Sequence, residues 1–195
     1  MIPRHSSCGE MRLGDIARCA EVYNELLGKD VLIRLENGTS LKLRFLEENF
    51  THLLGLHYLS DLDYFPANRK RQAFSLIRAG KITQAKLERS VFYSKIEQRV
   101  EMFERLPLFF LPGKCELIID FDPSKVKSYS NISADYILFI KEADMYLHLP
   151  LRYNEKRDIL FPQSFFPRRN KQYIDRQRIY RIHEINVVPY KEKPK

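Results

Sequence analysis

The chain of 195 residues has no tryptophan, only seven glycines and only three cysteines. Cys8, Cys19 and Cys115 are scattered, odd in number and without metal-ligand spacing, so we expect reduced thiols and neither a disulfide framework nor a zinc site. No apolar run approaches the roughly eighteen residues of a membrane span. Residues 1–10 are polar and carry no apolar signal core. We therefore expect a cytoplasmic protein without a membrane partner.

Several motifs of known chemistry are also missing. The sequence has no glycine-rich phosphate loop, no HExxH zinc pair and no GxSxG nucleophile elbow. The carboxylate pairs Asp61/Asp63 and Asp120/Asp122 resemble magnesium ligands, but no histidine supports either pair, and we interpret them as ends of helices or strands. No metal and no other cofactor is expected.

The positive charge is concentrated late in the chain. The net charge is +8, and residues 152–181 hold nine Lys/Arg against three Asp/Glu, a local balance of +6. A local excess of this kind attracts phosphates. Aromatic residues that can stack on unpaired bases are interleaved with these charges: Tyr153, Phe165, Phe166, Tyr173 and Tyr180. RNA is therefore the expected partner, and a solvated charged face is the alternative.

The hydrophobic periodicity is helical in the first half of the chain. It predicts helices over 15–27, 47–60, 71–81 and 83–105. Thr83 is expected to cap the long fourth helix, Pro107 to end it, and Gly80 to end the third. Between the first two helices, Asn37-Gly38 separates two alternating runs and predicts a β-hairpin with a two-residue turn.

Strand-like alternation dominates the second half. It predicts strands over 116–121, 134–141, 145–152, 158–165 and 178–188. Pro150 suggests that the third of these is an edge strand or carries a bulge. We expect an α+β fold, with an N-terminal β-hairpin and helices packed on a C-terminal antiparallel sheet of about four strands. Residues 1–30 are expected to form an N-terminal extension with a short helix, and residues 31–190 a single domain.

Metal-free RNA cleavage needs a base for the 2′-OH proton, an acid for the leaving oxygen and cations for the phosphate. The segment QSFFPRRNKQYIDRQ, residues 163–177, contains hydroxyls, amides and cations suited to this chemistry. Substrate binding is predicted for Arg152, Arg168, Arg169 and Lys171. Any basic loop would contain similar residues, so the inventory alone does not define a site.

Histidine is the usual proton shuttle near neutral pH. His52 and His57 lie five residues apart, which on one continuous helix offsets them by about 140°. We therefore expect them on different faces, not as a metal pair. A lone helical histidine is more often structural than catalytic.

Four stretches of the sequence resemble one known family. ENFTHLLGLHYLSD, GKIT, SNISADYILF and SFFPRRNKQYIDRQ, within residues 40–188, are similar to the PBECR4 domain, which belongs to the phage-associated barnase–EndoU–colicin–RelE-like (BECR) nuclease group. The resemblance implies helices packed on a four-stranded antiparallel sheet. It also implies a metal-independent endoribonuclease of phage or mobile-element origin that cleaves RNA by attack of the 2′-OH.

The same resemblance implies catalytic roles for His52, Ser164, Tyr173 and Gln177. No second histidine is aligned with a barnase-like acid, which leaves His148 and His183 as candidates. Two other functions fit the charge pattern. One is a non-catalytic RNA-binding module. The other is a protein-binding inhibitor of host defence, whose basic face would contact an acidic protein. A neutralising or host protein is accordingly a further partner to consider.

Overall fold

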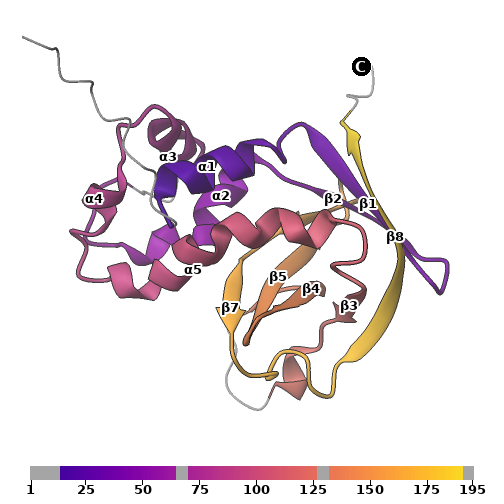
Figure 1. The fold of residues 1–195 in the computed structure, drawn as a ribbon. Coiled ribbons are helices and arrows are strands. Elements are labelled where there is room, and N and C mark those ends of the chain that lie inside the picture. The colour runs from indigo at the N-terminus through magenta and orange to yellow at the C-terminus, as the bar shows by residue number, and fades with distance from the viewer. Residues whose placement is uncertain (1–13, 65–69, 127–131, 191–195) are drawn as a thin grey trace, which may run out of the picture.

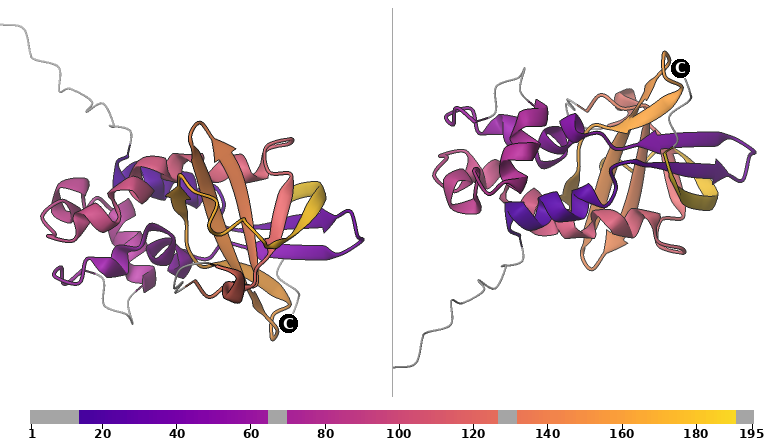
Figure 2. Two further views of the ribbon diagram at one scale, coloured as in Figure 1. Left: turned by 90° about the horizontal axis from the view of Figure 1, so that it is seen from below. Right: turned by 90° about the horizontal axis from the view of Figure 1, so that it is seen from above.

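The structure is a computed structural model that describes residues 14–64, 70–126 and 132–190. Helices gather on one side of a set of strands, and views from below and above keep them on that side (Figures 1 and 2). The α-helices are α1 (Ile16–Asn24), α2 (Glu47–Leu54), α3 (Lys70–Arg78), α4 (Gln84–Leu87) and α5 (Glu97–Met102). Within the described ranges, no helix is both long and apolar enough to cross a membrane.

The strands form one mixed sheet that closes on itself. They are β1 (Lys29–Leu35), β2 (Ser40–Arg44), β3 (Leu117–Asp120), β4 (Tyr136–Glu142), β5 (Met145–Asn154), β6 (Ile159–Pro162), β7 (Phe166–Arg168) and β8 (Arg178–Pro189). Their order is β4-β3-β8-β1-β2-β6-β5-β7, and β4 also pairs with β5. Over the described residues, seven strands therefore make a closed barrel, and β7 is added outside the ring on β5.

The predicted layout of helices on a sheet of about four strands is wrong. The strand β8 is twelve residues long, and its two halves pair with different partners. The first half pairs with β3 and the second with β1, so the N-terminal hairpin is part of the sheet. A parallel contact between β2 and β6, at Leu43 and Leu160, joins the hairpin to the remaining strands. The barrel follows from these long-range pairings, which local periodicity does not reveal.

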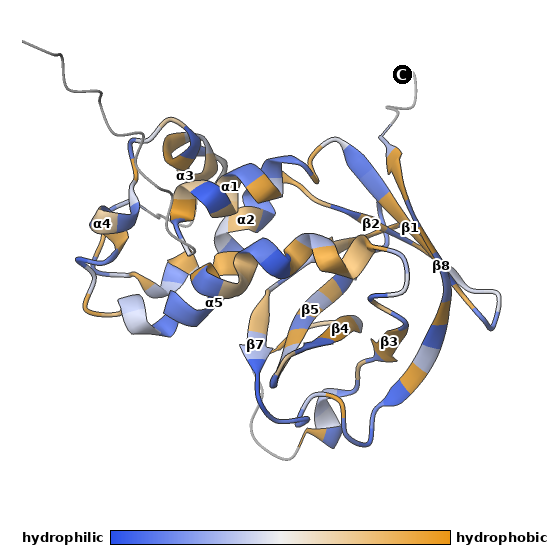
Figure 3. Ribbon diagram, in the orientation of Figure 1, coloured by the Kyte–Doolittle hydropathy of each residue, from blue (hydrophilic) through white to orange (hydrophobic). Residues whose placement is uncertain are grey.

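The hairpin itself is confirmed, with a longer loop than predicted. Register runs from Asp30–Arg44 to Arg34–Ser40. The backbone N–H of Leu35 donates to Thr39 and that of Gly38 donates to Leu35, so the turn spans three residues. Gly38 takes the left-handed conformation that the turn needs (φ +87°). The alternation that carries core residues to one face is visible along the strands in Figure 3.

The predicted long helix over 83–105 is broken. Only α4 and α5 are α-helical, and a 3-10 segment, η3 (Phe103–Phe110), follows and contains Pro107. The Ser90 hydroxyl donates to Asp61 and also accepts from the N–H of Phe92, which turns the chain between α4 and α5. The hydrophobic periodicity of this stretch nonetheless marks the side that faces the core, because Ile96, Val100, Phe103 and Leu106 are buried and Phe92 is partly buried.

The proline in β5 does not mark an edge. Pro150 is buried and β5 has neighbours on both sides, β4 on one and β6 and β7 on the other. The carbonyl of Pro150 still accepts a hydrogen bond, from the N–H of Gln163. Both faces of β5 are covered, so its buried residues do not alternate with exposed ones as predicted.

The main core joins the helices to the barrel. Aromatic residues of four elements meet around Tyr23, whose ring lies 5.2 Å from Phe50 and 5.7 Å from Phe74. The Tyr23 hydroxyl donates to the carbonyl of Leu46, just before α2. This packing fixes the position of α2, and with it the residues at the C-terminal end of that helix. Cys19 and Cys115 are buried free thiols, and Cys8 lies outside the described residues.

Candidate functional site

A cleft of about 380 Å³ lies where the C-terminal end of α2 meets β5 and β7. Its walls come from five parts of the chain: the end of α2 with the turn after it, α5, the residues before β4, the strand β5 and the segment around β7. The lining residues are His52, His57, Tyr58, Arg99, Ile132, Ser133, Pro150, Gln163, Ser164, Phe166, Arg168 and Tyr173.

Backbone hydrogen bonds hold the segment with Ser164 against α2. The N–H of Phe165 donates to the carbonyl of Leu53 (3.2 Å), one of the carbonyls at the helix end that have no partner within the helix. On the other side of Ser164, the N–H of Gln163 donates to Pro150 of β5 (2.8 Å). Ser164 is thus anchored between a helix end and a strand, close to His52 one residue before Leu53.

The two histidines of α2 and its following turn lie together, contrary to the sequence-based expectation. Their ring centroids are 5.5 Å apart, and both line the cleft. The expectation assumed one continuous helix, but α2 ends at Gly55, which is left-handed (φ +72°). The chain reverses there into a 3-10 turn, η1 (Leu56–Tyr58), which brings His57 back beside His52.

Gly55 is required by packing as well as by backbone conformation. A Cβ at this position would lie 2.9 Å from the ring of Tyr58 and 3.3 Å from the guanidinium of Arg99. Both distances are shorter than ordinary van der Waals contact. The glycine therefore allows a tyrosine and an arginine to approach the helix end closely.

The sequence does not single out Arg99, yet this residue lines the cleft. Its guanidinium donates to the Ser164 hydroxyl (2.9 Å) and more weakly to the Leu53 carbonyl (3.5 Å). Lost hydration lowers the pKa of Arg99 from its ordinary value, and the nearby positive charge of Arg168 acts in the same direction. Among the described residues, none forms an ion pair with Arg99.

Two guanidinium groups lie near the Phe166 ring. The Cζ atom of Arg99 lies 6.0 Å from the Phe166 ring centroid and that of Arg168 lies 5.3 Å from it. The lining contains two arginines and two histidines, and no carboxylate is among the described lining residues. A concave site with this composition attracts anions, because no described lining residue carries a negative charge.

Tyr173 closes the cleft floor together with Phe166, with ring centroids 5.3 Å apart. Behind them His148 is fully buried (0% exposed), stacked on Phe166 at 5.1 Å. Neither ring nitrogen of His148 has a hydrogen-bond partner in the described part of the chain. Burial lowers the pKa of His148 to about 4; the backbone of Phe166 and Tyr146 opposes this shift without reaching hydrogen-bond geometry.

His148 should make the protein sensitive to acid. Below pH 6.5 the unfolded chain takes up a proton at this residue, whereas the folded protein does not until about pH 4. The free energy of unfolding should therefore fall by about 3 kcal/mol across this window. Urea unfolding between pH 7 and pH 4 measures it. His148→Leu should flatten the dependence, whereas His183→Leu, at an exposed position, should leave it unchanged. An identical pH dependence in all three proteins would contradict the prediction.

Four of the predicted site residues do not line the cleft. The Gln177 amide exchanges two hydrogen bonds with the backbone of Asp122. Arg169 is exposed and pairs with Asp144 (3.3 Å), and Lys171 lies over the Tyr146 ring. Arg152 approaches only the rim, where its guanidinium contacts Ser133. Of the eight predicted residues, the structure therefore brings together His52, Ser164, Arg168 and Tyr173. His183 lines a separate hollow.

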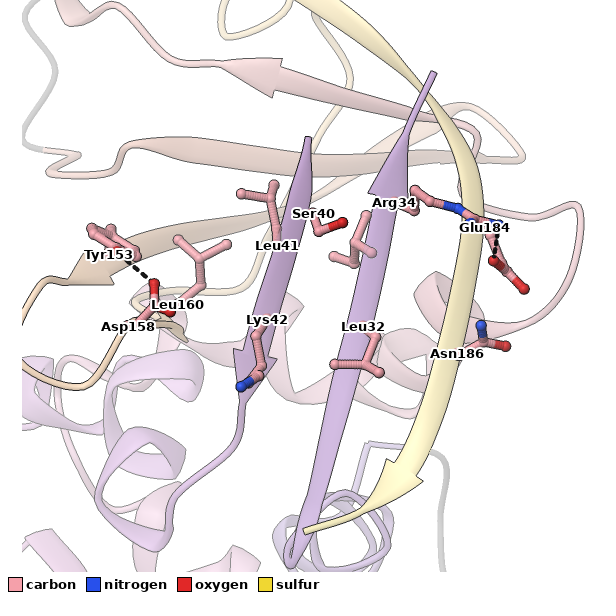
Figure 4. Close-up of a pocket in the computed structure, with 11 residues that line it drawn as sticks. Leu32, Arg34, Ser40, Leu41, Lys42, Tyr153, Asp158, Leu160, Glu184 and Asn186 are labelled. Carbon is pink, nitrogen blue, oxygen red and sulfur yellow. Dashed lines mark hydrogen bonds and ion pairs between the residues drawn. The ribbon is translucent and has the colours of Figure 1, made fainter. Parts of the chain in front are cut away.

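A second hollow, of about 400 Å³, lies on the outer face of β1, β2 and β8 (Figure 4). Its lining holds two cations, Arg34 and Lys42, and two carboxylates, Asp158 and Glu184. Arg34 pairs with Glu184 (2.6 Å), and the Tyr153 hydroxyl donates to Asp158 (2.6 Å). These contacts leave little net field for a charged ligand. The cleft with Arg99 is therefore the better candidate for chemistry on phosphates.

The protein is a closed barrel with helices on one side. Its cleft attracts anions and carries groups suited to proton transfer. A comparison with sequence models of protein families supports this interpretation of the cleft. The sequence model of the PBECR4 family, described as phage-Barnase-EndoU-ColicinE5/D-RelE like nuclease, matches residues 15–193. The chain belongs to this nuclease family, as its motifs indicated. No curated protein and no solved structure matches the chain.

Proposed function

We propose that this nuclease is a metal-independent endoribonuclease of phage or mobile-element origin, acting on RNA in the cytoplasm. One observation carries the proposal. His52, Ser164, Arg168 and Tyr173, from separate parts of the sequence, lie around one cleft whose described lining holds no carboxylate. That composition suits a phosphodiester, and it offers a divalent metal none of the carboxylates that usually bind one.

The proposed reaction is an attack of the 2′-OH on the adjacent phosphorus. His52 accepts the 2′-OH proton, the O2′–P bond forms, and the P–O5′ bond breaks. His57, 5.5 Å away between ring centroids, gives a proton to the departing O5′. The products are a 2′,3′-cyclic phosphate and a 5′-hydroxyl, with no net consumption of protons.

The remaining lining residues stabilise the charge on the phosphate. The Ser164 Oγ accepts a hydrogen bond from Arg99, which leaves its own proton free to point toward an anion. Held in this way by a cation, Ser164 serves better as a donor than as a nucleophile. Arg168 adds positive charge, and no described residue accepts a hydrogen bond from the Tyr173 hydroxyl, which makes that group a further donor.

The test is incubation of mixed RNAs with the protein in EDTA. We expect cleavage, with fragments that end in 2′,3′-cyclic phosphate by mass spectrometry. Absence of cleavage together with salt-dependent RNA binding would instead support a non-catalytic binding module. Absence of both activities would leave protein binding as the function.

A further inference from the structure

We propose that Arg99 and Tyr58 form a subsite for one unpaired nucleotide, in which Arg99 binds the phosphate and the Tyr58 ring stacks on the base. The inference rests on the proposed function, because it takes nucleic acid as the occupant of the cleft. It adds the structural class of the substrate: single-stranded and not duplex.

The first observation is that no described carboxylate pairs with Arg99. Its hydrogen bonds go to neutral acceptors, the Ser164 hydroxyl and the Leu53 carbonyl, and the Tyr58 side chain interacts with it as well. The side chain is half-buried, and its lost hydration lowers its pKa. A partly dehydrated guanidinium without a described carboxylate partner is costly unless an anion binds it. Arg168, whose guanidinium lies 5.3 Å from the same Phe166 ring, adds a second positive charge that an anion would neutralise.

The second observation is the position of Tyr58. Its side chain is exposed (40%), although the other aromatic rings of the cleft, Phe166 and Tyr173, are buried. The Tyr58 ring packs against His57, at 4.3 Å between ring centroids, and lies 5.5 Å from the Arg99 guanidinium. Gly55 fixes its place, since only a missing Cβ allows the ring so close to the helix end. An exposed aromatic ring held rigidly beside a phosphate site is suited to stacking on a base.

The two residues together favour an unpaired nucleotide. In a duplex both faces of each base are covered by its neighbours, so the Tyr58 ring would find no base face to contact. The cleft, at about 380 Å³, has the size of a small-molecule pocket and is too small to take in a double helix. A single strand can place one base outside its stack on Tyr58 while the adjoining phosphate reaches Arg99.

The experiment measures binding, not cleavage. The probe is a fluorescent single-stranded RNA in which every 2′-OH is 2′-O-methyl, so that no attack on phosphorus can occur. Its duplex with a complementary strand is the comparison. We expect the single strand to bind at least about tenfold more tightly than the duplex. Arg99→Gln and Tyr58→Ala should each weaken single-strand binding about tenfold or more, whereas Arg99→Lys and Tyr58→Phe should retain most of it.

Two matched controls distinguish binding at the subsite from a general effect of positive charge or of aromatic side chains on binding. Tyr153→Ala removes an equally exposed tyrosine (42%) from another face, and Arg157→Gln removes an exposed cation from the β5–β6 turn. Both should bind as the wild type does. Equal affinity for single strand and duplex, or full binding by Arg99→Gln and Tyr58→Ala, would overturn the subsite. Thermal melting confirms that each variant is folded. Because the probe cannot be cleaved, the binding result does not depend on whether the protein is a nuclease.

Discussion

Replacing His52 with alanine is expected to lower the rate of RNA cleavage about 10²- to 10⁴-fold while the protein still folds. A positioned general base contributes a factor of this size to proton transfer. His52 is half-buried at the end of α2, next to the segment with Ser164. No other described histidine lines the cleft except His57, which is assigned to the leaving oxygen.

The measurement is the initial rate on a labelled RNA in EDTA, with thermal melting to establish folding. His183→Ala is the matched control, because His183 is exposed on β8 and lines a different hollow. It should cleave at the wild-type rate. His52→Gln keeps a polar side chain, and it replaces the alanine variant if that variant fails to fold. A folded His52 variant with full activity would show that this residue is not the base.

Replacing Gly55 with alanine is expected to lower cleavage about 100-fold, although the residue bears no reacting group. The new Cβ would lie 2.9 Å from the Tyr58 ring and 3.3 Å from the Arg99 guanidinium, so both side chains must shift. Displacements of about 1 Å in an active site can reduce rates by this factor. The left-handed backbone (φ +72°) adds a loss of stability of about 1 kcal/mol.

Gly80 provides a control for the backbone effect alone. It follows α3 in the same left-handed conformation (φ +68°), and a Cβ there would meet nothing within 4 Å. Gly80→Ala and Gly55→Ala should lose similar stability in urea unfolding, but only Gly55→Ala should lose cleavage. If both variants cleave equally, the close approach of Tyr58 and Arg99 to the helix end has no functional role.

Local elements of the fold were predictable from the sequence, whereas their closure into a barrel was not. The Asn37-Gly38 hairpin and the strand over 178–188 appear where alternation places them. Alternation cannot show that the two halves of β8 pair with β1 and β3, because that pairing joins residues about 150 and 60 positions apart. The prediction of one long helix over 83–105 was wrong for a related reason, because the Ser90–Asp61 hydrogen bond, a long-range contact, turns the chain.

Most residues of the candidate site that could be predicted lie in stretches that resemble the family. His52, Ser164 and Tyr173 belong to stretches that resemble the family, and all three line the cleft. A continuous helix over 47–60 places His57 on a different face from His52, but a glycine within a short helical run, here Gly55, is itself a signal for a helix end. Arg99 stands among alternating charges in EQRVEMFER, where nothing distinguishes an arginine of a cleft from one on a solvated face.

The concentration of positive charge late in the chain predicted RNA as the partner, but most of the charged residues in this segment lie outside the cleft. Arg169 and Lys171 are engaged with Asp144 and Tyr146 on the surface. The cations that line the cleft are Arg168, from that segment, and Arg99, from a helix far away in sequence. The charge count therefore predicted a phosphate ligand. Of the two arginines assigned to that phosphate, it identified Arg168 and missed Arg99.

The most direct test of the account is cleavage of a DNA oligonucleotide that contains a single ribonucleotide, in the presence of EDTA. Attack by the 2′-OH is possible at that one position only. The account predicts one cut, directly 3′ of the ribonucleotide, giving one fragment with a 2′,3′-cyclic phosphate and another with a 5′-hydroxyl. Cuts at deoxyribonucleotide positions, or fragments that carry a 3′-hydroxyl and a 5′-phosphate, would contradict it.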